Sequence, residues 1–302
     1  MDRSREKPSG TKPVILLILT GLLWSTGGLL IKKVDSNPLA ISGMRSIIAS
    51  LVILVALGKP KFTWSLPQIA SSLSYSATVI LFVSANKMTT AANAILLQST
   101  APVYVALLSA WILKERAKLL DWITIVAVFG GMALFFFESL DSRGMTGNVL
   151  AVASGVTFAL FNIFMRLQKD GSPMESVLLG NILTAAIGVP FIVGALPSPS
   201  GWISLFILGV AQLGLSYVFY SEAIKYSTAL EAILILMIEP ILSPVWVFLF
   251  MGEIPGKLPM IGGAVVIGAV TARFVLRNLS GRAILLKYGV SRRSRRQDSA
   301  LL

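Results

Sequence analysis

The chain has 302 residues, of which 55% are hydrophobic and only 13% are charged. So little polar surface excludes a soluble globule of this length and indicates a protein that lies in a bilayer. The absence of cysteine excludes a disulfide framework and a thiolate metal site, and the absence of histidine removes the commonest general base. In a membrane protein, the net charge of +12 is typical of cytoplasmic loops that face anionic lipid, so no nucleic-acid partner is expected.

Ten apolar runs of membrane-spanning length follow one another along the chain, separated by charge, proline, glycine or asparagine. The expected spans cover residues 14–31, 39–57, 66–85, 90–113, 119–137, 147–165, 176–196, 202–223, 229–251 and 258–276. Because the loops between them are short, no sizeable soluble domain fits anywhere. The sequence therefore predicts an all-α membrane protein with ten transmembrane helices.

Basic residues are unevenly divided between the two sides of this arrangement. Of the 26 lysines and arginines, 20 fall on the side of the termini, 5 fall on the opposite side, and Arg45 lies inside the second span. Because such residues concentrate on the cytoplasmic side, both termini are predicted to be cytoplasmic. Residues 1–12 then form an N-terminal tail, and residues 278–302 form a basic tail that contacts anionic membrane lipid.

An internal repeat relates the two halves of the chain. A gapless shift of 138 positions superposes residues that are uncommon in apolar helices: Lys87 on Lys225, Thr90 on Thr228, Pro102 on Pro240 and Glu115 on Glu253. Slightly shorter shifts place Gly21 on Gly155 and Pro38 on Pro173. These matches predict two five-helix repeats, residues 13–143 and 144–277. Since five is an odd number of crossings, the second repeat must be inverted, which is an architecture of secondary transporters.

The order and spacing of several motifs resemble the EamA-type branch of the drug/metabolite transporter superfamily. The resemblance covers about residues 13–276 and is carried by Trp24, Ser25, Arg45, the segment 102–115, Glu239, Pro240 and Glu253. It implies a multi-pass exporter of small metabolites in the bacterial cytoplasmic (inner) membrane. Within the family, the chain looks most like the bacterial aromatic amino-acid exporters, although relatives carry other amino acids, cationic drugs or sugars.

Two prolines stand near the middle of the bilayer and indicate breaks in their helices. Pro102 lies about twelve residues into the fourth span, which is roughly 18 Å at ~1.5 Å per residue, and Pro240 has the same depth in the ninth span. Each proline frees the carbonyl four residues earlier, at Gln98 and Leu236, in a medium that supplies no hydrogen-bond donor. Neighbouring helices could satisfy these carbonyls, or a central cavity could hold water or substrate there.

Amides, hydroxyls and aromatic rings gather near this depth, and these groups could hold an aromatic zwitterion. The candidate substrate-binding residues are Trp24, Tyr75, Gln98, Tyr104, Phe158, Asn162, Tyr217 and Glu239. Pro102 and Pro240 are the candidate helix-break and gating residues. We expect the fourth and ninth helices to wall a central cavity with the first, third, sixth and eighth, while the fifth and tenth stand outside.

Arg45 and Glu239 are the two charges well inside spans, where ionisable residues are functional candidates by default. Arg45 lies some six residues into its helix, so we expect a structural role for it, either by snorkelling or by pairing with backbone carbonyls. For Glu239 three roles stay open: binding an ammonium group, carrying a proton, or capping broken backbone.

These features predict a secondary transporter that exports amino acids, aromatic or other neutral ones, by alternating access. Facilitated export is preferred, because a single acidic candidate without histidine gives little support for proton coupling. Proton-coupled efflux of cationic drugs or other small metabolites is the alternative function. A membrane-embedded enzyme would need paired acids, a nucleophile with a base, or a metal set, so we expect no catalytic residue, metal or cofactor, and a monomer.

Overall fold

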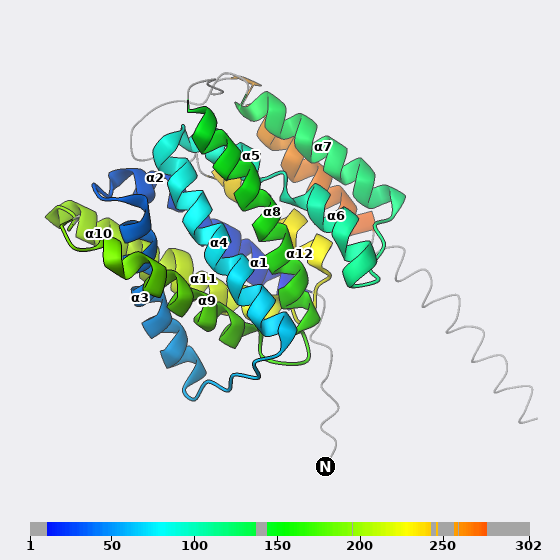
Figure 1. Cartoon of the computed structure of the whole chain (residues 1–302). Coiled ribbons are helices and arrows are strands. Elements are labelled where there is room, and N and C mark those ends of the chain that lie inside the picture. Colours follow the sequence, from blue (N-terminus) through cyan, green and yellow to red (C-terminus); the bar gives the residue numbers. More distant parts are fainter. Residues whose placement is uncertain are drawn as a thin grey trace, which may run out of the picture.

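The computed structural model describes residues 11–136, 144–194, 196–242, 246, 257–258 and 260–276. Within these ranges the chain forms helices and no strand (Figure 1). Seven helical segments among them are long and apolar enough to cross a membrane: Lys12–Lys33, Pro38–Leu57, Leu66–Met88, Asn93–Ile112, Met145–Leu167, Pro173–Phe191 and Pro199–Ala223. Two shorter apolar helices are Leu119–Leu134 and Met260–Leu276. The predicted all-α membrane fold is confirmed.

The count of ten spans stays a prediction, because much of the expected ninth span, including Pro244, lies outside the described residues. So do Glu253 and the basic tail. The first half comprises α1 (Lys12–Trp24), α2 (Gly27–Lys33), α3 (Pro38–Leu57), α4 (Leu66–Met88), α5 (Ala91–Gln98), α6 (Ala101–Ile112) and α7 (Leu119–Phe136). The second half comprises α8 (Met145–Leu167), α9 (Pro173–Gly188), the 3₁₀ turn η1 (Val189–Phe191), α10 (Pro199–Ile207), the π-helical segment η2 (Leu208–Leu215), α11 (Ser216–Ala223) and α12 (Ala229–Ile235).

Two threonines that the internal repeat superposes, Thr90 and Thr228, each stand at the beginning of equivalent helices in the two halves. The Thr90 hydroxyl accepts the backbone N–H of Asn93 at the start of α5, and the Thr228 hydroxyl accepts that of Glu231 at the start of α12, both at 3.1 Å. A side-chain acceptor at this position satisfies one of the free N–H groups of the first helical turn. The repeat seen in the sequence is therefore also a repeat of local structure.

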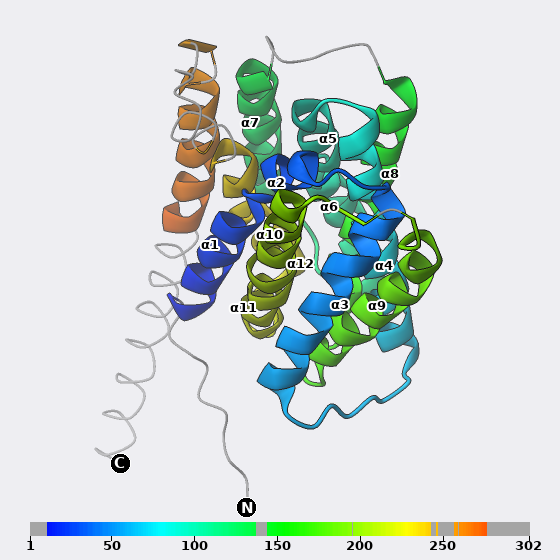
Figure 2. The same ribbon diagram turned by 90° about the vertical axis from the view of Figure 1, so that its left-hand side faces the viewer.

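The contacts between the two halves have the symmetry of an inverted repeat. Helix α4 packs along α8, and the equivalent pair with the halves exchanged, α11 and α1, also packs together. The pair α3 and α9 maps onto itself under this exchange and is likewise in contact. Figure 2 shows that α1 rises through the bundle while its counterpart α8 descends. The two halves therefore enter the bundle from opposite faces, as the odd number of crossings predicts.

The crossing of α3 and α9 brings two backbones into direct contact. A Cβ atom added at Gly188 would lie 2.5 Å from the Cα atom of Gly43 and 2.6 Å from the carbonyl oxygen of Leu39. No real side chain tolerates such distances, so this approach requires glycine. Because this pair maps onto itself when the halves are exchanged, the contact lies near the axis that relates them.

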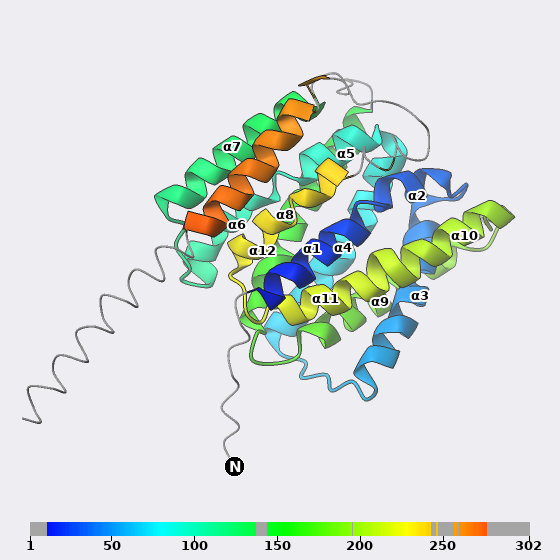
Figure 3. The same cartoon turned by 180° about the vertical axis from the view of Figure 1, so that it is seen from behind.

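Helix α7 and the helix Met260–Leu276 lie side by side at one edge of the bundle (Figures 1 and 3). Gly131 of α7 packs against the partner backbone, since a Cβ atom there would lie 2.8 Å from the carbonyl oxygen of Gly262. At one end of the pair, the Arg273 guanidinium forms an ion pair with the Asp121 carboxylate at 2.8 Å. These contacts agree with the expectation that the fifth and tenth helices stand outside the centre.

Candidate functional site

A cavity lies at the centre of the bundle, between the two halves. The cavity is narrow: the centre of a water molecule can reach about 40 Å³ of it, and about 380 Å³ lies between its atoms when the space open to solvent is counted. Its described lining residues are Trp24, Arg45, Thr78, Val79, Phe82, Gln98, Phe158, Gln212, Leu213, Tyr217 and Glu239. They belong to α1, α3, α4, α5, α8, η2, α11 and the segment after α12. Helix α7 and the helix Met260–Leu276 contribute none of them, as expected for the fifth and tenth spans.

Irregular backbone surrounds this cavity. Trp24 is the last residue of α1, which is separated from α2 by a turn, and Gln98 is the last residue of α5, which a turn at Ser99 and Thr100 separates from α6. A turn at Leu236 and Met237 follows α12 and precedes Glu239. Broken helices at this depth occur where the backbone is buried in protein or lines a cavity. The breaks near Pro102 and Pro240 are thus where the sequence predicts them.

The expected free carbonyls require a correction. The carbonyl of Leu236 is not free, because it accepts the backbone N–H of Glu239 at 2.9 Å. The i−4 argument assumes a continuous α-helix, whereas the chain tightens into a turn before the proline. The carbonyl oxygen of Gln98 faces α8, where a Cβ atom at Gly155 would lie 2.9 Å from it. The carbonyl of Leu236 is therefore satisfied within its own turn, whereas that of Gln98 lies against the backbone of α8.

Aromatic rings form one wall of the cavity. The Trp24 ring lies 5.6 Å from the Phe158 ring in an edge-to-face arrangement and 4.9 Å from the Tyr217 ring, measured between ring centres. The indole N–H of Trp24 donates to the Ser216 hydroxyl at 2.8 Å. Because this hydrogen bond and two ring contacts hold it, the Trp24 side chain is fixed in one orientation. The wall offers preorganised ring surfaces to a solute.

Two further candidates support this wall from behind. Tyr75 is fully buried; its ring contacts that of Tyr217 at 4.9 Å, and its hydroxyl donates to the side-chain oxygen of Asn181 at 3.1 Å. Asn162 is also fully buried and accepts the hydroxyl of Tyr220 at 2.6 Å. Neither residue is among those that line the cavity. The structure places them where they position the rings, and their role in binding substrate stays a prediction.

The remaining candidates divide between the cavity and its surroundings. Gln98 lines the cavity and donates its amide N–H to the Ser154 hydroxyl at 2.7 Å, and Glu239 lines it from the opposite half. Tyr104 is half-buried on α6 and is not a lining residue. Six residues at about 100° each turn Tyr104 roughly 120° away from Gln98 around a helix, before the break is considered. Its role in binding stays a prediction.

Two polar lining residues differ from expectation. Arg45 does not snorkel: it is only 1% exposed, lines the cavity and donates to the side-chain oxygen of Gln212 at 3.3 Å. Gln212 is absent from the sequence-based candidates. The feature of the sequence that could have identified Gln212 is a single amide between two glycines, in the segment that forms the π-helical η2. Such segments often occur at functional sites, because one extra residue per turn redirects side chains.

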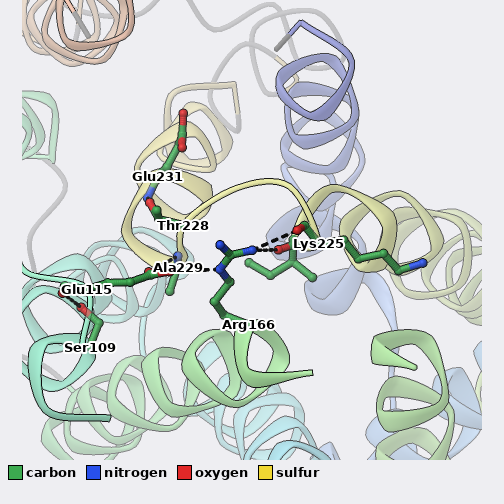
Figure 4. Close-up of polar contacts among 8 residues, drawn as sticks. Ser109, Glu115, Arg166, Lys225, Thr228, Ala229 and Glu231 are labelled. Carbon is green, nitrogen blue, oxygen red and sulfur yellow. Dashed lines mark hydrogen bonds and ion pairs between the residues drawn. The ribbon is translucent and has the colours of Figure 1, made fainter. Parts of the chain in front are cut away.

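A second polar cluster connects the ends of four helices (Figure 4). The Arg166 guanidinium, at the end of α8, pairs with the Glu115 carboxylate at 3.1 Å and donates to the carbonyls of Ile224 and Lys225 at 3.1 and 3.0 Å. The second oxygen of Glu115 accepts the backbone N–H of Ala229 at 3.3 Å. Glu115 and Arg166 thereby connect the ends of α6, α8, α11 and α12.

The opposite end of the molecule has a related contact. A shift of 134 positions, the one that matches Gly21 with Gly155, places Lys32 on Arg166. Lys32 donates to the carbonyl of Thr89 at 2.8 Å, and Lys87 donates to the carbonyl of Val34 at 2.5 Å. At both ends, a cation at the close of a half's first span therefore binds the connection between the third and fourth spans of the same half.

Replacing Glu115 by alanine is expected to destabilise the protein by about 1 to 3 kcal/mol, because it leaves the guanidinium of Arg166, whose side chain is only 14% exposed, without its carboxylate. The measurement is the thermal unfolding midpoint of the purified protein in detergent. Glu222→Ala is the matched control, since it removes a more exposed ion pair with Lys225 and should change stability by about 0 to 1 kcal/mol. Equal shifts for the two variants would contradict the assigned role of Glu115.

A central cavity between two inverted helical halves defines a membrane transport protein. The chain matches the EamA-like transporter family twice, over residues 11–137 and 145–274. It therefore belongs to this family.

Several curated proteins are similar over most of their length. An uncharacterized transporter of Archaeoglobus fulgidus is 24% identical over 84% of this chain and 93% of its own. The pseudopaline exporter CntI of Pseudomonas aeruginosa is 24% identical over 86% of this chain and 94% of its own. Solute carrier family 35 member G1 of Mus musculus is 26% identical over 93% of this chain and 83% of its own. A solved crystal structure has the same fold, with a TM-score of 0.76 and 18% identity over 89% of this chain and 99% of that chain.

Proposed function

We propose that this transporter exports amino acids, aromatic or other neutral ones, by alternating access of the central cavity. The observation that carries the proposal is the lining of that cavity: an aromatic wall, the amides of Gln98 and Gln212, and two ionisable side chains of opposite type, Arg45 and Glu239. An aromatic amino acid has a ring, an ammonium group and a carboxylate group. The aromatic wall matches the ring, and the two ionisable side chains match the two charged groups.

Each group has a distinct task in this account. The rings of Trp24, Phe158 and Tyr217 contact the apolar side chain of the cargo, where offset or edge contacts between rings are favourable. Glu239 attracts the ammonium group, and the Gln98 amide adds a hydrogen-bonding group on the first half. Because these residues come from both halves, rocking of one half against the other opens the cavity to either side in turn.

Facilitated release down a concentration gradient is the simplest energetic scheme. Glu239 is the acidic residue among the described lining groups, so cargo and protons would have to compete for one carboxylate in a coupled scheme. That same carboxylate favours the second candidate function, proton-coupled efflux of organic cations. The distribution of basic residues supports cytoplasmic termini, and a reporter fused after Lys225 is then expected on the side of the termini.

Release from preloaded liposomes tests the proposed function. Purified protein is reconstituted, the liposomes are loaded with labelled amino acids or cationic drugs, and release is followed with and without a pH gradient. We expect release of phenylalanine or other neutral amino acids at a rate that the gradient alters little. Strong acceleration by the gradient that Glu239→Gln abolishes would instead establish the proton-coupled scheme, and release of cations alone would reject amino-acid export.

A further inference from the structure

The guanidinium of Arg45 lies in the central cavity with most of its hydrogen-bonding capacity unused. A guanidinium has five N–H donors. Nη1 of Arg45 donates to Gln212 at a long 3.3 Å, and Nε has no partner among the described residues, although the side chain is 99% removed from solvent. Keeping an unpaired charge away from water is costly, so the guanidinium needs acceptors that the described part of the protein does not supply.

The protein itself supplies no counterion in the described part of the chain. The ion pairs found there join Arg166 with Glu115, Lys225 with Glu222, and Arg273 with Asp121. Glu239 lines the same cavity as Arg45 but forms no ion pair with it. Two ionisable side chains of opposite type therefore share one cavity without pairing with each other, which leaves the guanidinium of Arg45 open to an anionic group of a solute.

Local packing holds Arg45 and Gln212 in this arrangement. A Cβ atom at Gly209 would lie 2.5 Å from Ile48 and 3.0 Å from the carbonyl oxygen of Arg45, so η2 approaches α3 closely beside the arginine. A Cβ atom at Gly27 would lie 2.9 Å from the Gln212 amide nitrogen, so the missing side chain makes room for that amide. Two glycines thus permit the Gln212 side chain to orient the guanidinium.

We propose that Arg45, oriented by Gln212, binds the carboxylate of the cargo, so that the transporter selects solutes that carry a carboxylate over amines that lack one. This inference rests on the proposed function, because it concerns the same cavity. A guanidinium can bind both carboxylate oxygens through two parallel N–H bonds, which gives geometric selectivity that a lysine ammonium lacks. Solutes with a ring and an amine but no carboxylate leave Arg45 unpaired and bind weakly.

Competition binding to the purified full-length protein tests the proposal. Labelled phenylalanine is displaced by unlabelled phenylalanine, by phenethylamine, which lacks the carboxylate, and by 3-phenylpropionate, which lacks the amine. Wild type is expected to bind phenylalanine roughly 30-fold or more tightly than phenethylamine, as for loss of one partner of a buried charged pair. Arg45→Gln should weaken phenylalanine by a similar factor and leave phenethylamine unchanged, whereas Arg45→Lys should restore part of the loss.

A second variant keeps the test informative if Arg45→Gln does not fold. Gln212→Glu has nearly the same shape and places a permanent carboxylate on the guanidinium, so it should raise the unfolding midpoint while abolishing tight phenylalanine binding. Equal weakening of phenylalanine and phenethylamine by either variant, or equal affinity of the two ligands for wild type, would overturn the carboxylate assignment. Failure of wild type to bind or release any amino acid would instead reject the proposed function.

Discussion

Replacing Gly188 by alanine is expected to lower the free energy of unfolding by about 3 kcal/mol or more, at the upper end for overpacked sites. The added methyl group would overlap the backbone of Gly43 and Leu39, and backbone cannot move aside as a flexible side chain can. Because α3 and α9 meet near the axis between the halves, the strain should also displace the helices that wall the cavity. The measurement is the fraction of monodisperse protein in detergent after stepwise heating.

Gly130→Ala is the matched control for this substitution. Gly130 lies within α7, and a Cβ atom there would meet nothing within 4 Å. Alanine at an open helical position should be neutral or stabilising by up to ~1 kcal/mol. Equal melting of Gly188→Ala and Gly130→Ala would mean that the two helices do not approach as closely as described.

Replacing Trp24 by leucine is expected to reduce the affinity for aromatic amino acids by about 5-fold to 150-fold, which corresponds to roughly 1 to 3 kcal/mol for a lost ring contact and hydrogen bond. The ring contacts to Phe158 and Tyr217 and the hydrogen bond to Ser216 disappear together. Trp24→Phe keeps a ring but loses the hydrogen bond, so it should shift preference among aromatic and aliphatic amino acids. Release from liposomes preloaded with phenylalanine and leucine measures both effects.

Trp111→Leu provides the control for Trp24, because Trp111 lies on α6 with 88% of its surface exposed. Removal of this outward-facing ring should leave the preference among amino acids unchanged. If Trp24→Leu releases phenylalanine and leucine in the wild-type ratio at equal expression, the aromatic wall does not select the cargo.

The all-helical fold, the inversion and the presence of helix breaks could be predicted from sequence because they depend on long-range patterns, whereas the count of ten spans stays a prediction. Apolar runs locate helices, an odd number of crossings forces inversion, and a mid-span proline such as Pro102 marks a break. The break at Leu236 shows the limit of the argument. Which carbonyl is freed depends on how the chain tightens before the proline, and the sequence does not reveal this.

The residues that line the cavity were harder to predict, because a break in a helix changes which of its faces points inward. Trp24, Gln98, Phe158, Tyr217 and Glu239 line the cavity, and their role in binding a substrate stays a prediction. An arginine six residues from a helix end has the same sequence pattern whether it snorkels or turns inward, so the position of Arg45 depends on tertiary packing.

Gln212 and Tyr104 illustrate the same difficulty. Gln212 faces the cavity because η2 is π-helical, and helical periodicity of 3.6 residues per turn does not anticipate that register. Tyr104 follows the break between α5 and α6, where the periodicity that begins at Gln98 no longer applies.

Protection of a single cysteine in the cavity is the most direct test of the claim that cargo binds there. The chain has no native cysteine, so Thr78→Cys, on a lining residue of α4, gives one reactive thiol without background. Lys169→Cys, at an exposed position away from the cavity, is the control. Saturating phenylalanine is predicted to slow alkylation of the Thr78→Cys variant by about 10-fold or more, as for a site that is over 90% occupied, and to leave the Lys169→Cys rate unchanged. Unchanged alkylation at position 78, in a variant that still releases phenylalanine from liposomes, would contradict the account.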